Sequence, residues 1–135
     1  MLPIEFVVLS RPLSLQTSSR ARFQAWKDQV RAEAAKAWGA RQVLGEGEFH
    51  LTIVHLHHDG STPDVDNIIK PIQDALEGVV LFNDNLVSDV ESHRRVIPGR
   101  FETLRLPRLL VDALDSPLDC VYVRLADAVN LEDLL

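Results

Sequence analysis

One segment of the sequence, residues 63–84, constrains the fold and the chemistry of this chain most strongly. It reads PDVDNIIKPIQDALEGVVLFND. Within it, residues 67–79 carry apolar side chains at the helical period, and the opposite arc is polar, which predicts an amphipathic helix with one buried face. The apolar positions of this predicted helix are Ile68, Ile69, Ile72, Ala75, Leu76 and Val79.

Two aspartates, Asp64 and Asp66, stand directly before this predicted helix. Asp66 is a good helix N-cap, so we expect both aspartates on an extended stretch that enters the helix. Side chains two residues apart on an extended chain point the same way. Their carboxylates therefore repel each other unless a cation lies between them, and a divalent metal with oxygen ligands fits that place. The alternative is that one aspartate caps the helix and the other is a solvated loop residue.

Polar side chains share one face of the predicted helix. Asn67, Lys70 and Asp74 follow one another at spacings of three and four residues, which stacks them on a helix. Lys70 would then lie one turn from the aspartate pair, where its charge could stabilise a phosphate oxygen or a leaving oxygen. The alternative role of Lys70 is an ordinary surface ion pair with Asp74.

The whole string, D-x-D-N-x-x-K-P-x-x-D-A-L-x-G followed by a hydrophobic turn and N-D, resembles the RusA family of Holliday-junction resolvases. The resemblance implies that Asp64, Asp66 and Asp84 are metal ligands and that Lys70 is needed for cleavage. It also implies a magnesium cofactor, with manganese as an alternative, and a homodimer. Asn83 departs from the family, because many relatives carry a second acidic residue at that position.

The expected function is therefore that of a magnesium-dependent endodeoxyribonuclease that resolves four-way DNA junctions by symmetric phosphodiester hydrolysis in recombination and repair. Two alternatives stay open. The chain could be a related nuclease that acts on a non-junction nucleic acid, or a binding module that keeps the fold without cutting. Metal-dependent cutting separates the enzymes from the binding module, and the preferred substrate separates the two enzymes.

The charge pattern is unusual for a DNA-binding protein, because the net charge is −6. The distribution is uneven, however. Residues 10–41 hold seven Lys or Arg against two acids, and residues 93–108 hold five against one, whereas residues 42–92 hold ten acids against one Lys. We therefore expect arginines on basic margins to contact phosphates beside an acidic metal site. These arginines are Arg20, Arg22, Arg94, Arg95 and Arg100.

The length and composition fit one globular domain that spans residues 1–135, since 46% of the residues are hydrophobic. No window approaches a membrane span, and the start of the chain lacks the pattern of a signal peptide, so a cytoplasmic location is expected. Cys120 is the single cysteine and cannot form a disulfide within the chain.

Hydrophobic periodicity predicts an α/β fold, a mixed sheet packed by two main helices, similar to that of the RusA family. The histidines of the second strand, His55 and His57, are expected on a solvated strand face, because their spacing matches no zinc site. In the third strand, Val87, Asp89, Glu91 and His93 are expected to share one face. The predicted strands are residues 4–9, 48–57, 86–96 and 118–125, and the predicted helices are residues 20–38, 67–79 and 107–114.

Overall fold

The computed structural model describes residues 2–14, 16–58, 60, 62–97 and 102–135. Four strands form one mixed sheet in the order β1-β4-β2-β3. β4 is antiparallel to both β1 and β2, whereas β2 and β3 are parallel. The α/β class and the mixed sheet are therefore confirmed. The strands are β1 (Ile4–Val8), β2 (Phe49–His57), β3 (Val87–Val96) and β4 (Cys120–Asp127).

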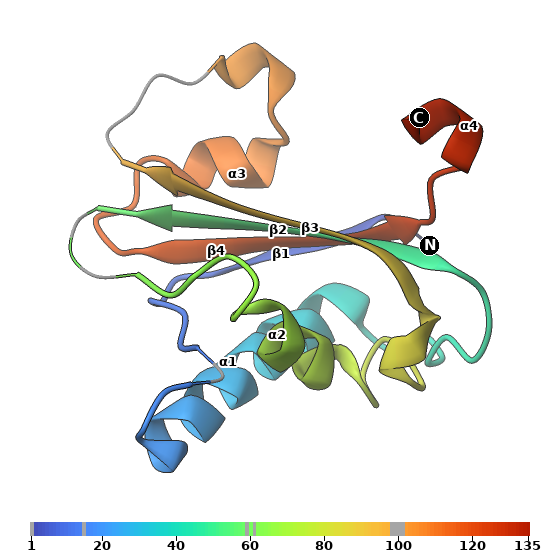
Figure 1. The fold of residues 1–135 in the computed structure, drawn as a ribbon, viewed down its shortest axis with the longest axis horizontal. Coiled ribbons are helices and arrows are strands. Elements are labelled where there is room, and N and C mark those ends of the chain that lie inside the picture. The colour runs from blue at the N-terminus through green and yellow to red at the C-terminus, as the bar shows by residue number, and fades with distance from the viewer. Residues whose placement is uncertain (1, 15, 59, 61, 98–101) are drawn as a thin grey trace.

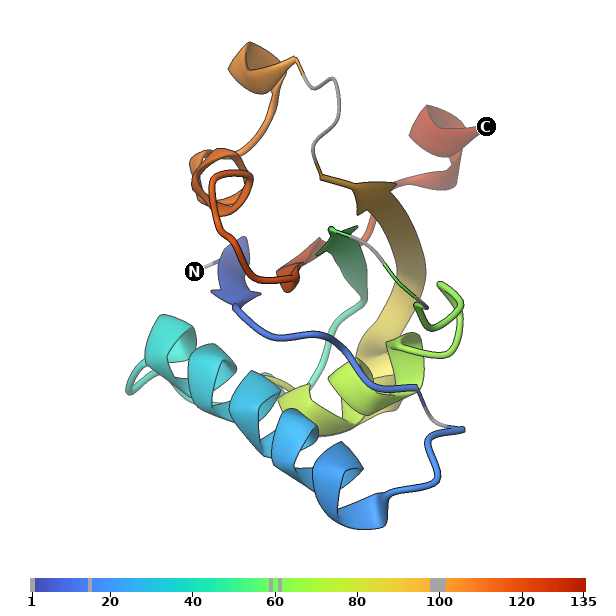
Figure 2. The same cartoon turned by 90° about the vertical axis from the view of Figure 1, so that its left-hand side faces the viewer.

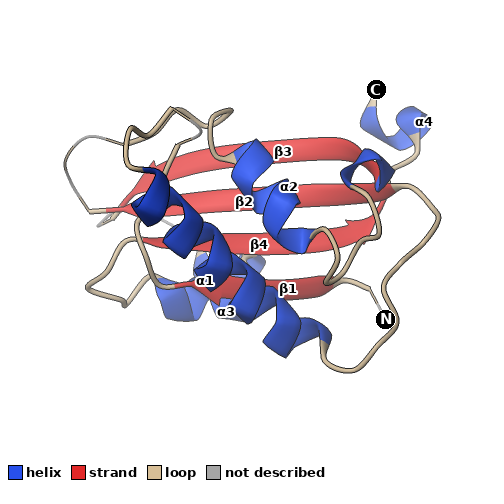
Figure 3. Cartoon of the chain, turned by 90° about the horizontal axis from the view of Figure 1, so that it is seen from below, coloured by secondary structure: helices blue, strands red, loops and turns tan. Residues whose placement is uncertain are grey.

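Helices cover both faces of the sheet, but unequally. α1 (Arg20–Trp38) and α2 (Ile69–Leu76) lie on one face, and α3 (Arg108–Ala113) lies on the other (Figures 1 and 2). Seen from below, α1 crosses the strands obliquely beside α2 (Figure 3). The remaining elements are the 3-10 turns η1 (Asp84–Leu86) and η2 (Thr103–Arg105) and a C-terminal turn of helix, α4 (Leu131–Leu134), which the sequence pattern did not predict.

The core has two parts, one on each face of the sheet. β1 shows the reason, because Ile4, Phe6 and Val8 are buried in a cluster on one face, whereas Val7 packs against a cluster on the other. The larger cluster fills the space between the sheet and α1 and α2, and a smaller one lies beneath α3. The central strands β2 and β4 contribute to both clusters. Residues of the smaller cluster are Leu56, Ile97, Leu110, Ala113, Cys120 and Tyr122.

α1 begins and ends where its sequence signals indicate. The Ser19 hydroxyl accepts a hydrogen bond from the backbone N–H of Arg22 at 3.4 Å, as an N-cap does. At the other end Gly39 has φ +70°, a conformation that glycine adopts without a steric penalty. The helix has the predicted bounds, and one apolar stripe of it is buried. Its buried residues are Phe23, Trp26, Val30, Ala34 and Trp38.

α2 is shorter than the predicted helix of residues 67–79. Residues 65–68 form turns, and the helix starts only at Ile69. The prediction that Asp66 caps the helix with its side chain was wrong, because the N-cap residue is Ile68 and no side chain caps this end. The late start places Pro71 in the first turn, where its missing N–H has no helical partner to lose.

β3 contains a bulge that changes which side chains share a face. Phe49 pairs with Val87, but the next residue of β2, His50, pairs with Asp89, so Ser88 is the additional residue. Val87 therefore packs against the larger core cluster, whereas the side chain of Asp89 contacts His50 on the other face of the sheet. The expected common face of Val87 and Asp89 was wrong for this reason.

Gly78 follows the C-cap residue of α2, and its backbone conformation can be tested by substitution. Its φ is +84°, and a Cβ atom at this position would meet no atom within 4 Å. Replacing Gly78 with alanine is therefore expected to cost about 1–2 kcal/mol of unfolding free energy through backbone conformation alone. Urea unfolding measures this difference. Gly45 is the matched control, because it also has open space around it but lies outside the left-handed region. Equal stability of the two alanine variants would contradict the argument.

Candidate active site

Lys70 and Asp84 come together from two different elements. Lys70 lies in the first turn of α2, and Asp84 begins η1. The Lys70 ammonium donates to Asp84 Oδ2 and also pairs with Asp74 Oδ1 at 2.9 Å. The backbone N–H of Asp84 donates to Glu77 Oε1 at 3.2 Å, so the C-terminal end of α2 holds η1 in place. The Lys70 ammonium therefore bridges one carboxylate of α2 and one carboxylate of η1.

The environment of Lys70 keeps its side chain charged. The hydrogen bond to Asp84, followed by the one to Asp74, raises the pKa of Lys70 above its ordinary value of 10.5, although burial opposes the shift. A lysine in this state carries a positive charge at neutral pH and is not a general base. The predicted ion pair with Asp74 is present, but Lys70 shares it with Asp84.

α1 supports this cluster from the other side. Lys27 Nζ lies 3.9 Å from Asp74 Oδ2. The Arg31 guanidinium donates to the backbone carbonyls of Asp74 at 3.0 Å and Ala75 at 3.3 Å. These contacts hold α2 against α1 at the level of the Lys70 cluster. The sequence pattern did not indicate them, because they join residues more than forty positions apart.

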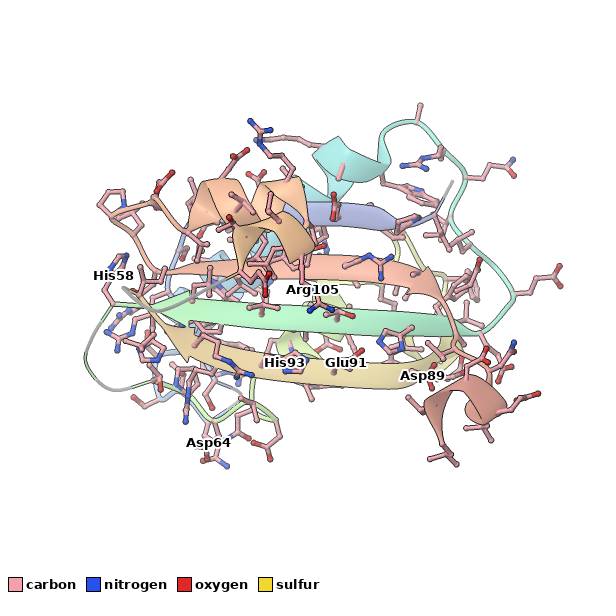
Figure 4. All side chains as sticks on the ribbon, turned by 90° about the horizontal axis from the view of Figure 1, so that it is seen from above. His58, Asp64, Asp89, Glu91, His93 and Arg105 are labelled. Atoms are coloured by element: carbon pink, nitrogen blue, oxygen red, sulfur yellow. The ribbon has the colours of Figure 1, made fainter. Side chains whose placement is uncertain are left out.

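The aspartate pair lies on a loop and not on the helix. Asp64 precedes the turn of residues 65–68, and Asp66 lies within that turn. Both side chains are exposed, and neither has a hydrogen-bond or ion-pair partner among the residues that the structure describes. Seen from above, Asp64 lies outside the edge formed by β3 (Figure 4). Two carboxylates therefore face solvent, and the described part of the chain supplies neither with an ion-pair partner.

The three predicted metal ligands lie along one edge of the sheet. Asp84 stands at the start of β3, and the Asp64–Asp66 loop meets the same strand further along, where Ser92 donates to the Val65 carbonyl. Within the described ranges, no group of three or more His, Cys, Asp or Glu side chains is close enough to hold one metal ion. The structure thus brings Lys70 to Asp84 and leaves the role of the three aspartates as metal ligands a prediction.

Two of the predicted phosphate-binding arginines lie at the start of α1. Arg20 and Arg22 are both exposed. The Arg20 guanidinium lies 5.6 Å from the centre of the Phe23 ring, which limits its freedom through a cation–π contact. Arg22 borders a hollow of about 340 Å³ that Arg11 also lines. This corner of the molecule therefore presents positive charge to solvent.

The remaining predicted arginines point in different directions. Arg94 donates to the Thr62 hydroxyl at 3.0 Å and to the Pro63 carbonyl at 3.2 Å, on the loop that carries the aspartate pair. Arg95 donates to the Arg94 carbonyl at 2.9 Å and lines an apolar groove beneath α3, on the other face. Arg100 lies outside the described residues. The structure therefore does not gather these arginines on one surface.

The expectation that His55 lies on a solvated strand face was wrong. His55 is 1% exposed, and neither of its ring nitrogens has a hydrogen-bond partner within the part of the chain described. Its ring centroid is 5.5 Å from that of His57. Burial, followed by the nearby charge of His57, lowers the pKa of His55 from 6.5 to about 4. A strand pattern alone cannot reveal this, because the burial of a strand face depends on what packs against it in the folded protein.

His55 should make the protein sensitive to acid. The unfolded chain takes up a proton at this residue near pH 6.5, but the folded chain does so only near pH 4, so stability is complete above pH 6.5 and falls between these values. Between pH 7 and pH 5 the expected loss is about 2 kcal/mol of unfolding free energy. Urea unfolding of the wild type and of His55→Leu checks this, because the variant should lose the dependence. An equal pH slope in both would contradict it.

On the face of β3 that lies away from the main core, histidine and acidic side chains form a hydrogen-bond network, which the sequence alone did not indicate. His50, which is buried, lies between Asp89 and Glu91, and His93 contacts the same Glu91 (Figure 4). Although partial burial opposes ionisation, hydrogen bonds from His93 and His50 hold the pKa of Glu91 below its usual value. The backbone N–H of Val129 donates to Asp89, which links the network to the C-terminal segment.

Comparison with known proteins identifies the family. The family model described as endodeoxyribonuclease RusA matches residues 9–111, which is most of the chain. The chain belongs to the RusA family. The RusA match includes every predicted catalytic residue, and it excludes β1 and β4. RusA-family nucleases generally depend on divalent metals.

One curated relative is much longer than the chain. Over 65 residues the chain is 31% identical to the chloroplastic stromal processing peptidase of Pisum sativum. The similar stretch makes up 48% of this chain but only 5% of the peptidase.

Among the described residues, no helix combines the length and the apolar character needed to cross a membrane.

Proposed function

We propose that this chain is a magnesium-dependent endodeoxyribonuclease that resolves four-way DNA junctions by symmetric phosphodiester hydrolysis, in recombination and repair. The observation that carries the proposal is the Lys70 ammonium, held by Asp84 and four residues after the second of two loop aspartates that have no partner among the described residues, in a RusA-family chain. We further propose that residues 1–135 act as one RusA-like domain.

Asp64, Asp66 and Asp84 are the proposed ligands of the metal. Carboxylates are the hard oxygen donors that Mg²⁺ prefers, and Mn²⁺ accepts the same donors. The donor set fits a cation, because neither the Asp64 nor the Asp66 carboxylate forms an ion pair within the described structure, whereas Asp84 is balanced by Lys70. A bound metal would supply Lewis-acid chemistry at the scissile phosphate.

Lys70 would contact the phosphate directly. An ammonium group has three hydrogens, and Lys70 uses two of them on Asp74 and Asp84. The third remains to donate to a phosphate oxygen, where a fixed positive charge stabilises the charge that develops during hydrolysis. Because the two carboxylates orient the ammonium before DNA binds, little rearrangement is needed.

Phosphate contacts away from the reacting bond are proposed for Arg20, Arg22, Arg94 and Arg95. Arg20 and Arg22 suit this role best, since both are exposed and neither is tied to the aspartate loop. With a net charge of −6, the protein needs such local positive margins to hold DNA beside its acidic site. Binding should therefore weaken steeply as salt rises.

We also propose a homodimer with two sites. A four-way junction offers two nearly equivalent strands, and a protein with twofold symmetry would present one site to each. A cytoplasmic location stays a prediction.

The acidic composition favours a second candidate function, that of a RusA-like nuclease that acts on a nucleic acid other than a junction. A non-cleaving binding module is the third, and the Lys70 and Asp84 pair counts against it.

The decisive experiment compares a labelled synthetic four-way junction with a matched linear duplex. The purified protein is incubated with each in magnesium or in chelator, and the products are resolved on a denaturing gel. Paired, symmetric, magnesium-dependent nicks in the junction alone would support the proposal. Equal cutting of the duplex would favour the second candidate, and binding without cuts would favour the binding module.

A further inference from the structure

β3 is one of the two edge strands of the sheet, and it presents two polar side chains toward the aspartate loop. In the parallel register, Ser92 lies opposite Ile53, and Arg94 lies opposite His55. Both partners on β2 are buried, so Ser92 and Arg94 point to the same face of the sheet as the main core. A hydroxyl and a guanidinium at these positions require polar partners.

Those partners are the residues that flank Asp64. Ser92 Oγ donates to the Val65 carbonyl at 2.6 Å. Arg94 donates to the Thr62 hydroxyl at 3.0 Å and to the Pro63 carbonyl at 3.2 Å. The loop is thus attached to β3 on both sides of Asp64.

The same loop is attached to α2 at its other end. The N–H of Asn67 donates to the Asp64 carbonyl at 3.1 Å, and that of Ile69 donates to the Asp66 carbonyl at 3.4 Å. The Asp64 and Asp66 side chains themselves remain without partners in the described structure. Each of these hydrogen bonds therefore acts on the backbone of the loop or on a residue beside the aspartates, and leaves both carboxylates available.

β3 also continues directly from the third aspartate. Asp84 opens η1, whose last residue, Leu86, is followed at once by Val87 of β3. A strand rises about 3.3 Å per residue and is rigid within a sheet. The distance along the edge between Asp84 and the aspartate loop is therefore set by one strand.

We propose that Ser92 and Arg94 are positioning residues that fix the backbone around Asp64 and so set the Asp64 and Asp66 carboxylates relative to Asp84. This inference rests on the proposed function. It assigns Arg94 to the loop in preference to the DNA phosphate. The two assignments differ in what they do to metal binding and to the salt dependence of DNA binding.

The test uses Ser92→Ala and Arg94→Gln in the full chain, with Mn²⁺ alone as the probe. Loss of a group that orients metal ligands typically weakens metal binding about tenfold to a hundredfold, and calorimetry measures this directly. Ser92→Thr keeps the hydroxyl and should restore most of the affinity. Ser88→Ala is the matched serine control, since that hydroxyl donates to Glu48 and not to the aspartate loop. Arg108→Gln is the matched arginine control, since its partner is Asp112 on α3.

Two further measurements separate the possible outcomes. Backbone amides of residues 64–68 should exchange with solvent faster in Ser92→Ala and Arg94→Gln than in the controls, with or without metal. The salt slope of junction binding in chelator should stay unchanged in Arg94→Gln, whereas loss of a phosphate contact lowers it by about 1.

Unchanged exchange and unchanged Mn²⁺ affinity would overturn the inference, and a reduced salt slope alone would assign Arg94 to the phosphate. Failure of the proposed function looks different, because the wild type itself would then leave the junction uncut. The exchange rates decide the positioning role in that case too.

Discussion

Replacing Asp66 with asparagine is expected to abolish DNA cleavage while DNA binding is kept or strengthened. The substitution preserves the shape of the side chain but removes one carboxylate charge from the proposed metal site. Stabilisation by a metal contributes several kcal/mol, so a rate loss of at least about 1000-fold is expected. Binding does not suffer, because less negative charge then faces the phosphates. Single-turnover cleavage and a mobility-shift assay measure the two effects.

Asp112→Asn is the matched control for this substitution. Asp112 is exposed on α3 and pairs with Arg108, on the opposite face of the sheet from the aspartate loop. Its variant should cut at the wild-type rate. Cleavage by the Asp66 variant at a comparable rate would show that this carboxylate is no part of the reaction, and the assignment of the site would have to be abandoned.

Replacing Lys70 with alanine is expected to slow the chemical step by about 100-fold or more, the usual effect of removing one group that stabilises the transition state. Folding should be largely unaffected, because the side chain is about half exposed. Metal binding should also persist, since no predicted ligand is lost. Single-turnover kinetics at saturating enzyme report the chemical step without a contribution from product release.

Lys36→Ala is the matched control, because Lys36 also forms an ion pair on a helix surface, in its case with Glu33. The raised pKa of Lys70 adds a second expectation. The pH–rate profile of the wild type should show no loss of activity from lysine deprotonation up to about pH 10. An unchanged single-turnover rate in the Lys70 variant would mean that the lysine merely balances Asp84.

The sequence predicted most of the fold, because the signals for its main elements are local. The bounds of α1 followed from a serine cap, an apolar stripe and a closing glycine, each readable within a few residues. The start of α2 was misplaced because an aspartate can cap a helix or occupy a turn, and only the tertiary structure decides between them. The burial of His55 has the same origin, since it depends on packing from distant segments.

The candidate site was predictable in part. The motif indicated Lys70 and the three aspartates, and the structure places Lys70 against Asp84. The motif could not indicate that Ser92 and Arg94 contact the aspartate loop. Those contacts depend on the register between β2 and β3, which a single bulge alters. Arg31 was equally invisible, since it reaches Asp74 from another helix.

The position of β4 has a consequence for when this protein can become active. The last strand in the sequence inserts between the first and second, so Ile4 is joined to Leu125 and Leu51 to the same residue. Contacts so distant in sequence form slowly. During synthesis, the three aspartates and Lys70 are therefore made before β4, the strand that completes the sheet beneath them. We expect a partly synthesised chain to be unable to nick DNA, which delays a potentially harmful activity until folding is complete.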